Sequence, residues 1–423
     1  MAGRISRRRF IKKGLAAAGG VVALGTAIDR LGPALYAQTK PPIRIGAQGI
    51  LSGPYGGYGE FGRQGGLLAV EEINHNGGIL GREVEIRFRD EELKPPITVS
   101  NLRYFVQDWG ADVAIGIDAS NDVLAAAEVM PQLDRVLIVH HAATEKLNEI
   151  DVYQKHNQYV FRVCVPVYQD GIASALIAKD FHHVKRWATI SPDYEYGYTC
   201  WKFFRQVLSH FRPDVQYVGE AWCKFNTADF APYISKVMAQ KPEGIFSTQW
   251  GGEAVAFVRQ AKRFGVFQNI GAMMIGMGAA MDVLEGLGAE YPDGVWASCR
   301  YWFRYPETER NKAFVGRYHK RWGHYPSYPS EMMYSCVNTA KAAMEKAHST
   351  KTADLIAALQ GMELDTPAGK RLFRAEDHQA VYPVPWGQIT HDPAYPMPII
   401  ANLKVSPTTE YYRWPPFTKL FGV

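Results

Sequence analysis

Three glycines near the start of the chain form a phosphate-binding pattern: Gly57, Gly59 and Gly62 in "GYGEFG" spell G-x-G-x-x-G. A dinucleotide loop of this kind begins at the end of a strand, so that the pyrophosphate meets the start of the next helix. Here the strand-like run "IRIGAQG" ends at Gly49, and the nearest strand-end acid, Asp90, lies far beyond Gly62. The context argues against a nucleotide site, and we expect these glycines to let the backbone approach a ligand or a neighbouring lobe closely.

Other residue combinations that carry out chemistry are weak or missing. Histidine pairs at 140–141 and 182–183 suggest a metal site, but adjacent side chains on a strand point to opposite faces. The sequence has no H-E-x-x-H motif, its cysteines match no metal-ligand spacing, and "SPDYEYG" lacks the G-x-S-x-G of a nucleophile elbow. No acid and base pair stands out either. We therefore expect no metal, no cofactor and no enzymatic activity.

Short β-branched runs alternate with helical stretches along most of the chain. Strands are expected at 43–49, 83–89, 112–117, 135–140, 186–191, 215–220, 244–249 and 272–276, and helices at 60–75, 96–108, 121–133, 170–182, 197–210, 229–240 and 251–264. This alternation predicts an α/β fold in which helices cover both faces of parallel sheets. After residue 300 the pattern changes to helices at 307–322, 331–347 and 353–360, followed by a strand-rich, proline-rich tail.

The chain also repeats one arrangement of elements. Tyr58 and Gly59 lie between the strands expected at 43–49 and 83–89, and Tyr196 and Gly197 lie between those at 186–191 and 215–220. Two similar lobes in tandem would place corresponding loops on facing edges. Because open α/β sheets bind ligands outside the carboxyl ends of their strands, we expect a ligand cleft between the lobes.

The first 37 residues have the features of an export signal. Arg7 and Arg8 precede an apolar run rich in Gly and Ala, which is too short to span a bilayer, and Ala37 offers a small residue for cleavage. The pattern resembles twin-arginine signals, with Ile11 where Leu is commoner. It predicts a signal peptide at 1–37, no membrane insertion after cleavage, and a mature protein in the periplasm.

Charge and cysteine content exclude some classes of partner. The formal charge is +5, but the first 37 residues hold seven of the 47 basic side chains and one of the 42 acidic ones. The rest of the chain is thus nearly neutral and has no electrostatic footprint for nucleic acid. Of the five cysteines, Cys200 and Cys223 could form a disulfide, but we expect mainly small buried side chains.

The stretch "LSGPYGGYGEFGRQGGLLAVEEINHNGGILGREVEIRFRD" (51–90) resembles the opening of the leucine/isoleucine/valine-binding family of periplasmic binding proteins, and "FVRQAKRFGV" (257–266) adds a second patch. The resemblance implies a receptor that delivers a small molecule to the membrane subunits of an ABC importer. It also implies the type I fold, with two Rossmann-like lobes joined by three crossovers near 166, 297 and 377. Lobe 1 would comprise 42–165 plus 298–376, and lobe 2 would comprise 166–297 plus 377–423.

The resemblance also implies where a ligand carboxylate binds. The family places a hydroxyl residue after the strand that ends in "VAIGI", which here is Ser120, and a backbone donor followed by Thr after "VLIVH", which here are Ala142 and Thr144. These positions suit a carboxylate, because hydroxyls and free N–H groups at the start of a helix favour an anion. The alternative for Ser120 is a simple helix cap.

One departure from the family concerns the amino group of the ligand. Family members that bind α-amino acids hold the ammonium with an acid, and Gly278 occupies about that position here. Asp118 or Glu331 could supply the missing charge from another direction, which leaves amino acids and amides open. An unpaired buried ammonium is costly, so we favour an apolar or aromatic acid.

Aromatic side chains near the expected cleft support such a ligand. Tyr58, Tyr196 and Trp250 would offer stacking surfaces, with ordinary packing as the alternative, while packing is favoured for Tyr301 and Trp302. Two competing functions stay open: an exported nicotinamide-dependent oxidoreductase, and a sensor that passes the same ligand signal to a membrane kinase.

Overall fold

Two sheets carry the fold of this computed structural model, which describes residues 40–406 and 412–417. The predicted signal peptide at 1–37 lies outside the described residues. The chain divides into two units at Pro41, and all the elements below lie in the second, Pro42–Val423. Within the described part, no helix has both the length and the apolar character needed to cross a membrane.

The first sheet has five parallel strands. Their spatial order is β2 (Val84–Asp90), β1 (Ile43–Gly49), β3 (Val113–Gly116), β4 (Leu137–Val139) and β5 (Val160–Arg162). The strands β1, β3, β4 and β5 are buried almost throughout, as expected when helices cover both faces of a parallel sheet.

The second sheet has seven strands. Their order is β15 (Ile399–Val405), β14 (Pro385–Thr390), β10 (Trp296–Ser298), β9 (Ala272–Ile275), β8 (Gly244–Ser247), β6 (Arg186–Pro192) and β7 (Gln216–Cys223). Only β14 and β15 run antiparallel to their neighbours. A small antiparallel sheet is formed by β11 (Glu363–Thr366), β12 (Gly369–Phe373) and β13 (Ala380–Val381).

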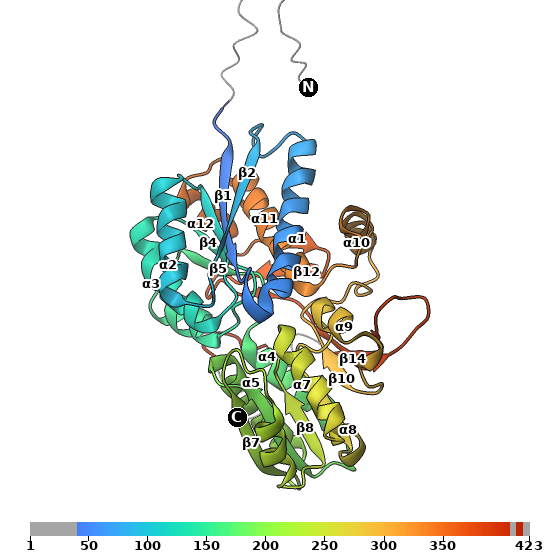
Figure 1. Cartoon of the computed structure of the whole chain (residues 1–423). Coiled ribbons are helices and arrows are strands. Elements are labelled where there is room, and N and C mark those ends of the chain that lie inside the picture. Colours follow the sequence, from blue (N-terminus) through green and yellow to red (C-terminus); the bar gives the residue numbers. More distant parts are fainter. Residues whose placement is uncertain (1–39, 407–411, 418–423) are drawn as a thin grey trace, which may run out of the picture. The chain divides into compact units, whose positions relative to one another are not determined.

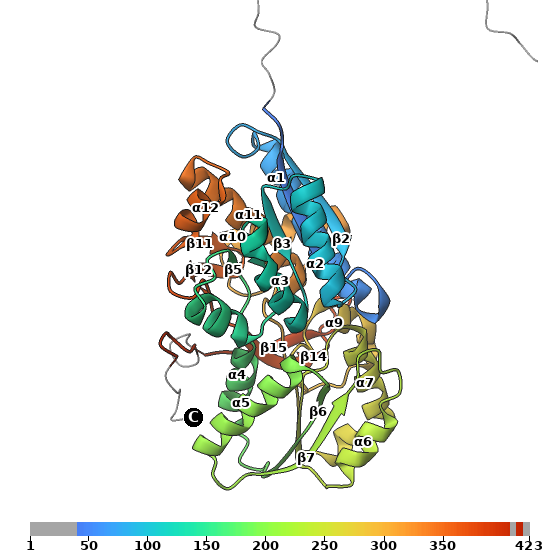
Figure 2. The ribbon, with the colours of Figure 1, turned by 90° about the vertical axis from the view of Figure 1, so that its left-hand side faces the viewer.

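Figures 1 and 2 show the elements of the first sheet above those of the second. The helices of the upper group are α1 (Gly56–His75), α2 (Pro95–Arg103), α3 (Ser120–Leu133), α10 (Glu309–Trp322), α11 (Tyr328–Ala347) and α12 (Thr352–Leu359). Those of the lower group are α4 (Val167–Ala178), α5 (Glu195–Phe211), α6 (Ala231–Met238), α7 (Gly251–Arg263), α8 (Val266–Asn269) and α9 (Met281–Leu287). Short turns of helix occur at η1 (Gly53–Tyr55), η2 (Tyr104–Asp108), η3 (Leu147–Gln154) and η4 (Gly288–Glu290). We call the two groups lobe 1 and lobe 2.

The chain passes between the lobes three times: between β5 and β6, between β10 and α10, and between β13 and β14. The predicted α/β class with two parallel-sheet lobes is confirmed. The residue boundaries assigned to each lobe stay a prediction.

The glycine motif lies inside α1 rather than in a strand-to-helix turn. A Cβ atom on Gly59 would lie 1.5 Å from the carbonyl oxygen of Ile50, and one on Gly65 would lie 2.0 Å from that of Ser330 in α11. Gly59 of the motif, and Gly65 after it, therefore allow α1 to pack closely against lobe 1 backbone. They do not form a loop around a phosphate.

Candidate functional site

Six loops meet at one small cavity between the lobes. Its lining residues are Asp118, Ser120, His141, Ala143, Tyr194, Tyr196, Trp250, Met277 and Arg300. They follow β3, β4, β6, β8, β9 and β10, so the cavity lies at the carboxyl ends of both sheets, where open α/β folds bind ligands. The space measures about 10 Å³, close to that of one water, and a larger molecule requires the lobes or side chains to move apart.

Ser120 is the first residue of the 14-residue helix α3 and faces this cavity. The N-cap is Ala119, which makes no side-chain capping bond, so Ser120 does not act as the predicted alternative, a helix cap. An uncapped helix start offers free N–H groups and the positive end of the helix dipole. This wall of the cavity is therefore suited to an anion.

The carbonyl oxygens of residues 141–144, in the loop after β4, all accept hydrogen bonds from other parts of the protein. Arg300 Nη1 donates to the oxygen of His141 (2.8 Å), Arg162 Nη1 donates to those of Ala142 (3.3 Å) and Thr144 (2.7 Å), and the amide of Val167 donates to that of Ala143 (2.7 Å). We call these contacts the carbonyl clamp. Within the described part of the chain, the amides of Ala143 and Thr144 find no acceptor. The loop thus keeps main-chain donors for another partner.

The structure places the predicted pair Ala142 and Thr144 beside the cavity rather than on its wall. The amide of Ala142 donates to Ile117 O at 3.0 Å, and the hydroxyl of Thr144 accepts from the amide of Lys146 at 3.3 Å. Ala143, between them, lines the cavity. A ligand role for Ala142 and Thr144 stays a prediction.

Aromatic rings also line the cavity. Trp250 stacks on Tyr55 with ring centroids 4.1 Å apart, and the ring of Tyr58 meets that of Trp250 edge-on at 5.2 Å. Tyr196 faces the cavity, and its hydroxyl donates to Asp170 at 3.3 Å. The structure therefore brings Tyr196 and Trp250 to the cavity, while Tyr58 supports Trp250 from lobe 1.

Gly278 lies just outside the cavity, and its neighbour Met277 lines it. The hydroxyl of Tyr291 donates to Gly278 O at 3.1 Å, and a Cβ on Gly278 would lie 2.5 Å from that hydroxyl. A side chain at 278, acidic or not, has no room without rearrangement.

Asp118 is buried and already has several partners. Its Oδ2 accepts from the amide of Ile50 at 2.6 Å, and its Oδ1 lies 3.1 Å from His140 Nε2 and 3.2 Å from His141 Nδ1. Burial works against the charged carboxylate, but the two histidines outweigh it and lower the pKa of Asp118. Burial also lowers the pKa of His141, to about 3. Ile117 precedes Asp118 with φ of 76°, an unusual and strained value for a β-branched residue.

This contact corrects the expectation that His140 and His141 point to opposite faces. The strand β4 ends at Val139, so strand alternation no longer applies to them. No group of three or more potential metal ligands occurs in the described part of the chain. Glu331, the other candidate for an ammonium partner, pairs with buried Arg371 instead and does not line the cavity.

Arg300 is the functional candidate that sequence reasoning missed. It is 1 % exposed, and its Nη2 donates to Asp170 Oδ2 at 2.9 Å. Burial favours a neutral guanidinium, yet Asp170 outweighs burial and raises the pKa of Arg300. Burial likewise raises the pKa of Asp170 against the effect of Arg300. Because arginine does not lose its proton, we take this close pair as ionised at neutral pH.

The signal for Arg300 was its place in the sequence, two residues after β10. The neighbouring Tyr301 and Trp302 are buried, and the hydroxyl of Tyr301 donates to Asn311 at 2.6 Å, as packing roles require.

All five cysteines are buried with free thiols, so Cys200 and Cys223 form no disulfide.

A family model described as a periplasmic binding protein matches residues 42–393. The chain belongs to the periplasmic binding protein family. The resemblance to its leucine/isoleucine/valine-binding members is confirmed by a curated relative, the leucine-, isoleucine-, valine-, threonine- and alanine-binding protein of Pseudomonas aeruginosa. The two are 24% identical over 356 residues, which cover 81% of this chain and 88% of the relative.

Solved structures show the same fold as this binding protein. An amino acid ABC transporter substrate-binding protein from Pseudomonas fluorescens Pf-5 matches with a TM-score of 0.76 and 22% identity, over 88% of this chain and 98% of that one. An ABC transporter solute-binding protein from Rhodopseudomonas palustris BisB5, in complex with 3,4-dihydroxybenzoic acid, matches with a TM-score of 0.76 and 21% identity, over 86% and 97%.

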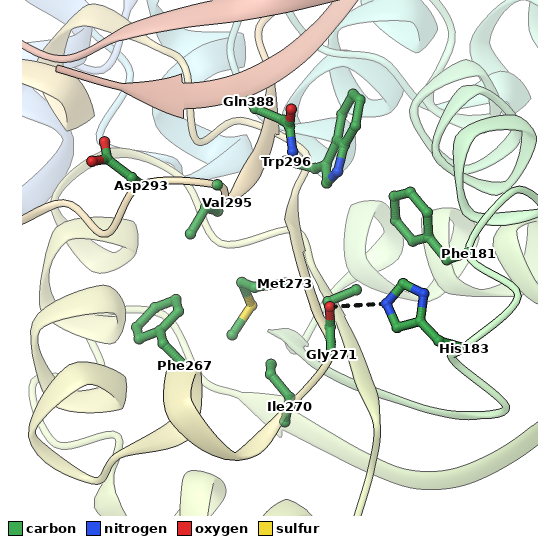
Figure 3. A pocket seen from close by; sticks show the side chains of 12 residues that line it. Phe181, His183, Phe267, Ile270, Gly271, Met273, Asp293, Val295, Trp296 and Gln388 are labelled. Carbon is green, nitrogen blue, oxygen red and sulfur yellow. Dashed lines mark hydrogen bonds between the residues drawn. The ribbon is translucent and has the colours of Figure 1, made fainter.

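A larger cavity of about 390 Å³ lies elsewhere in the binding protein (Figure 3). Phe181, Phe267 and Trp296 contribute rings to it, and His183 contacts the carbonyl of Gly271 at 3.3 Å. All of its lining residues come from lobe 2, where they precede or begin β6, β9 and β10 or lie on β14. The cavity between the lobes is therefore the better candidate, since it draws on both lobes and on the carboxyl ends of the strands.

Proposed function

We propose that this protein is an exported solute-binding receptor of an ABC importer, and that it binds a small carboxylic acid with an apolar or aromatic body. The lobes close around the acid, and the membrane subunits of the importer recognise the closed form. Family membership supports a transport role in the periplasm rather than an enzymatic one.

One observation carries the choice of ligand: hydrogen-bond donors and aromatic rings line the same cavity. The donors are the start of α3 with Ser120, the loop amides near Ala143, and Arg300. Charge-assisted bonds from a guanidinium to a carboxylate are among the stronger hydrogen bonds in proteins. Tyr194, Tyr196 and Trp250 offer flat surface for the remainder of the ligand.

The ligand in the Rhodopseudomonas structure, 3,4-dihydroxybenzoic acid, is an acid of this kind, and it supports the proposal by analogy. The curated relative is named for amino acids, so amino acids or amides are the second candidate. Export itself is part of the proposal and rests on the basic and apolar segments within residues 1–37.

A thermal-shift and calorimetry panel tests the ligand class. Benzoate, 3,4-dihydroxybenzoate and 3-phenylpropanoate are compared with leucine, valine and benzamide. We expect the acids to raise the melting temperature and benzamide not to, because the amide carries no negative charge. If leucine and valine stabilise the protein and none of the acids does, the proposed ligand class is wrong. A visible or near-ultraviolet cofactor band in the purified protein would favour the oxidoreductase instead.

A further inference from the structure

The cavity between the lobes has a surplus of donors and few acceptors. The carbonyl clamp occupies the oxygens of residues 141–144, including those of His141 and Ala143, which line the cavity. Asp118, the only carboxylate among the lining residues, has three donors already. A ligand ammonium would enter this space without an unengaged partner, and burying an unpaired ammonium is unfavourable.

Arg300 lines the cavity and has one buried donor that is unused. Nη1 bonds His141 O and Nη2 bonds Asp170, whereas Nε is buried and has no hydrogen-bond partner within the described residues. A buried donor without an acceptor is unfavourable. The side chain also lines the cavity, so a carboxylate there lies next to a guanidinium that has an unused donor.

The location of Arg300 links it to both lobes. It follows β10 of lobe 2, pairs with Asp170 of α4, and holds the loop after β4 of lobe 1 through His141. A ligand that contacts Arg300 therefore contacts a residue that is bonded to both lobes.

We propose that Arg300 is a ligand-contacting residue that selects carboxylic acids without an α-ammonium group, held in place by Asp170 and the carbonyl of His141. The inference rests on the proposed function and narrows its substrate class. The guanidinium attracts the carboxylate of either kind of ligand but repels a nearby ammonium, so the repulsion is what disfavours amino acids.

Matched pairs of acids test the selection in the wild-type protein. The pairs are 4-methylpentanoate with leucine and 3-phenylpropanoate with phenylalanine, and each pair differs only in the α-ammonium. We expect the amine-free acid to bind at least tenfold more tightly in whichever pair binds. Equal or tighter binding of the amino acid would overturn the inference while leaving a carboxylate receptor intact. No binding of any of the four, together with no response to benzoate or 3,4-dihydroxybenzoate, would overturn the proposed function as well.

Variants of Arg300 then assign the effect to this side chain. Arg300→Gln should weaken binding of the amine-free acid at least tenfold and reduce the ratio of its affinity to that of the amino acid. Arg300→Lys should restore part of the affinity. Arg212→Gln is the matched control, because Arg212 also bonds carbonyls and pairs with an acid, but in lobe 2 away from the cavity. Loss of stability with unchanged affinity is expected there. If circular dichroism shows that the Arg300→Gln protein is folded and its affinity ratio between the two ligands equals that of the wild type, the role of Arg300 is refuted.

Discussion

The rings of Tyr55 and Trp250 stack across the cleft with their centroids 4.1 Å apart and their planes 30° from parallel. Tyr55 belongs to η1 of lobe 1, and Trp250 is the residue before α7 of lobe 2. The pair therefore forms a direct contact between the lobes, beside the candidate ligand cavity. Contacts of this kind stabilise the closed arrangement only, and so they add to the affinity of any ligand that requires closure.

Trp250→Ala should weaken ligand binding at least tenfold, about 1.4 kcal/mol, because it removes both a cavity wall and the contact with Tyr55. Isothermal titration with the best acid of the panel measures the loss. Trp296→Ala is the control, since Trp296 lines the larger cavity of lobe 2. If Trp296→Ala weakens the same acid and Trp250→Ala does not, the binding site lies in the larger cavity.

Ser120→Ala should lower affinity for a carboxylate by about 0.5–1.5 kcal/mol, the usual range for one hydrogen bond, and leave the melting temperature of the free protein unchanged. The reason is that Ser120 faces the cavity and does not cap α3. Thr308→Ala provides the contrast, because Thr308 caps α10 by accepting from the amide of Asn311 within lobe 1. That change should lower stability by about 0.5–2 kcal/mol and spare affinity. If Ser120→Ala instead lowers stability and leaves affinity unchanged, Ser120 contributes only to the stability of the fold.

Gly278→Asp should destabilise the protein by about 1–3 kcal/mol without creating a leucine site, because its side chain would collide with the Tyr291 hydroxyl and with Ile275. Thermal denaturation with and without leucine gives both quantities. A gain of leucine binding at unchanged stability would show that position 278 can hold an ammonium partner.

The free energy of unfolding should depend on pH through His141. The imidazole has an ordinary pKa near 6.5 when unfolded, and burial lowers it to about 3 in the folded protein. Between these values the unfolded chain binds a proton that the folded chain does not, so His141 reduces stability as pH falls below 6.5. His141→Gln removes that term. The stability gap between wild type and variant at pH 7 should therefore shrink by roughly 2 kcal/mol at pH 5, as followed by urea denaturation. A constant gap would contradict a buried neutral His141.

Much of the fold could be predicted from local patterns. The run expected as a strand at 43–49 matches β1 residue for residue, because an alternation of buried strands and amphipathic helices leaves few alternatives. The strand β5, only Val160–Arg162, was missed because three apolar-rich residues within "YVFRVCV" carry no periodicity. The strand β10 was missed for the same reason, and with it the position of Arg300.

The site was harder to predict because its geometry depends on contacts between distant residues. The sequence pointed to the loop after β4, but its orientation is determined by Arg162 and Arg300, which bond its carbonyls from two different elements. That arrangement brings Ala143, rather than Ala142 or Thr144, to the wall of the cavity. The positions of Ser120, Tyr196 and Trp250 at the cavity were easier to predict, since each residue closely follows a strand that the sequence pattern predicts.

Each wall of the cavity belongs to a loop that follows a different strand, from Asp118 in one lobe to Arg300 at a passage between them. A substitution in one loop changes one part of the cavity wall and leaves the strands of both sheets unaltered. New solute preferences can therefore arise in this scaffold through a few scattered point changes. Conversely, grafting any one loop from a relative should not transfer that relative's preference as a whole.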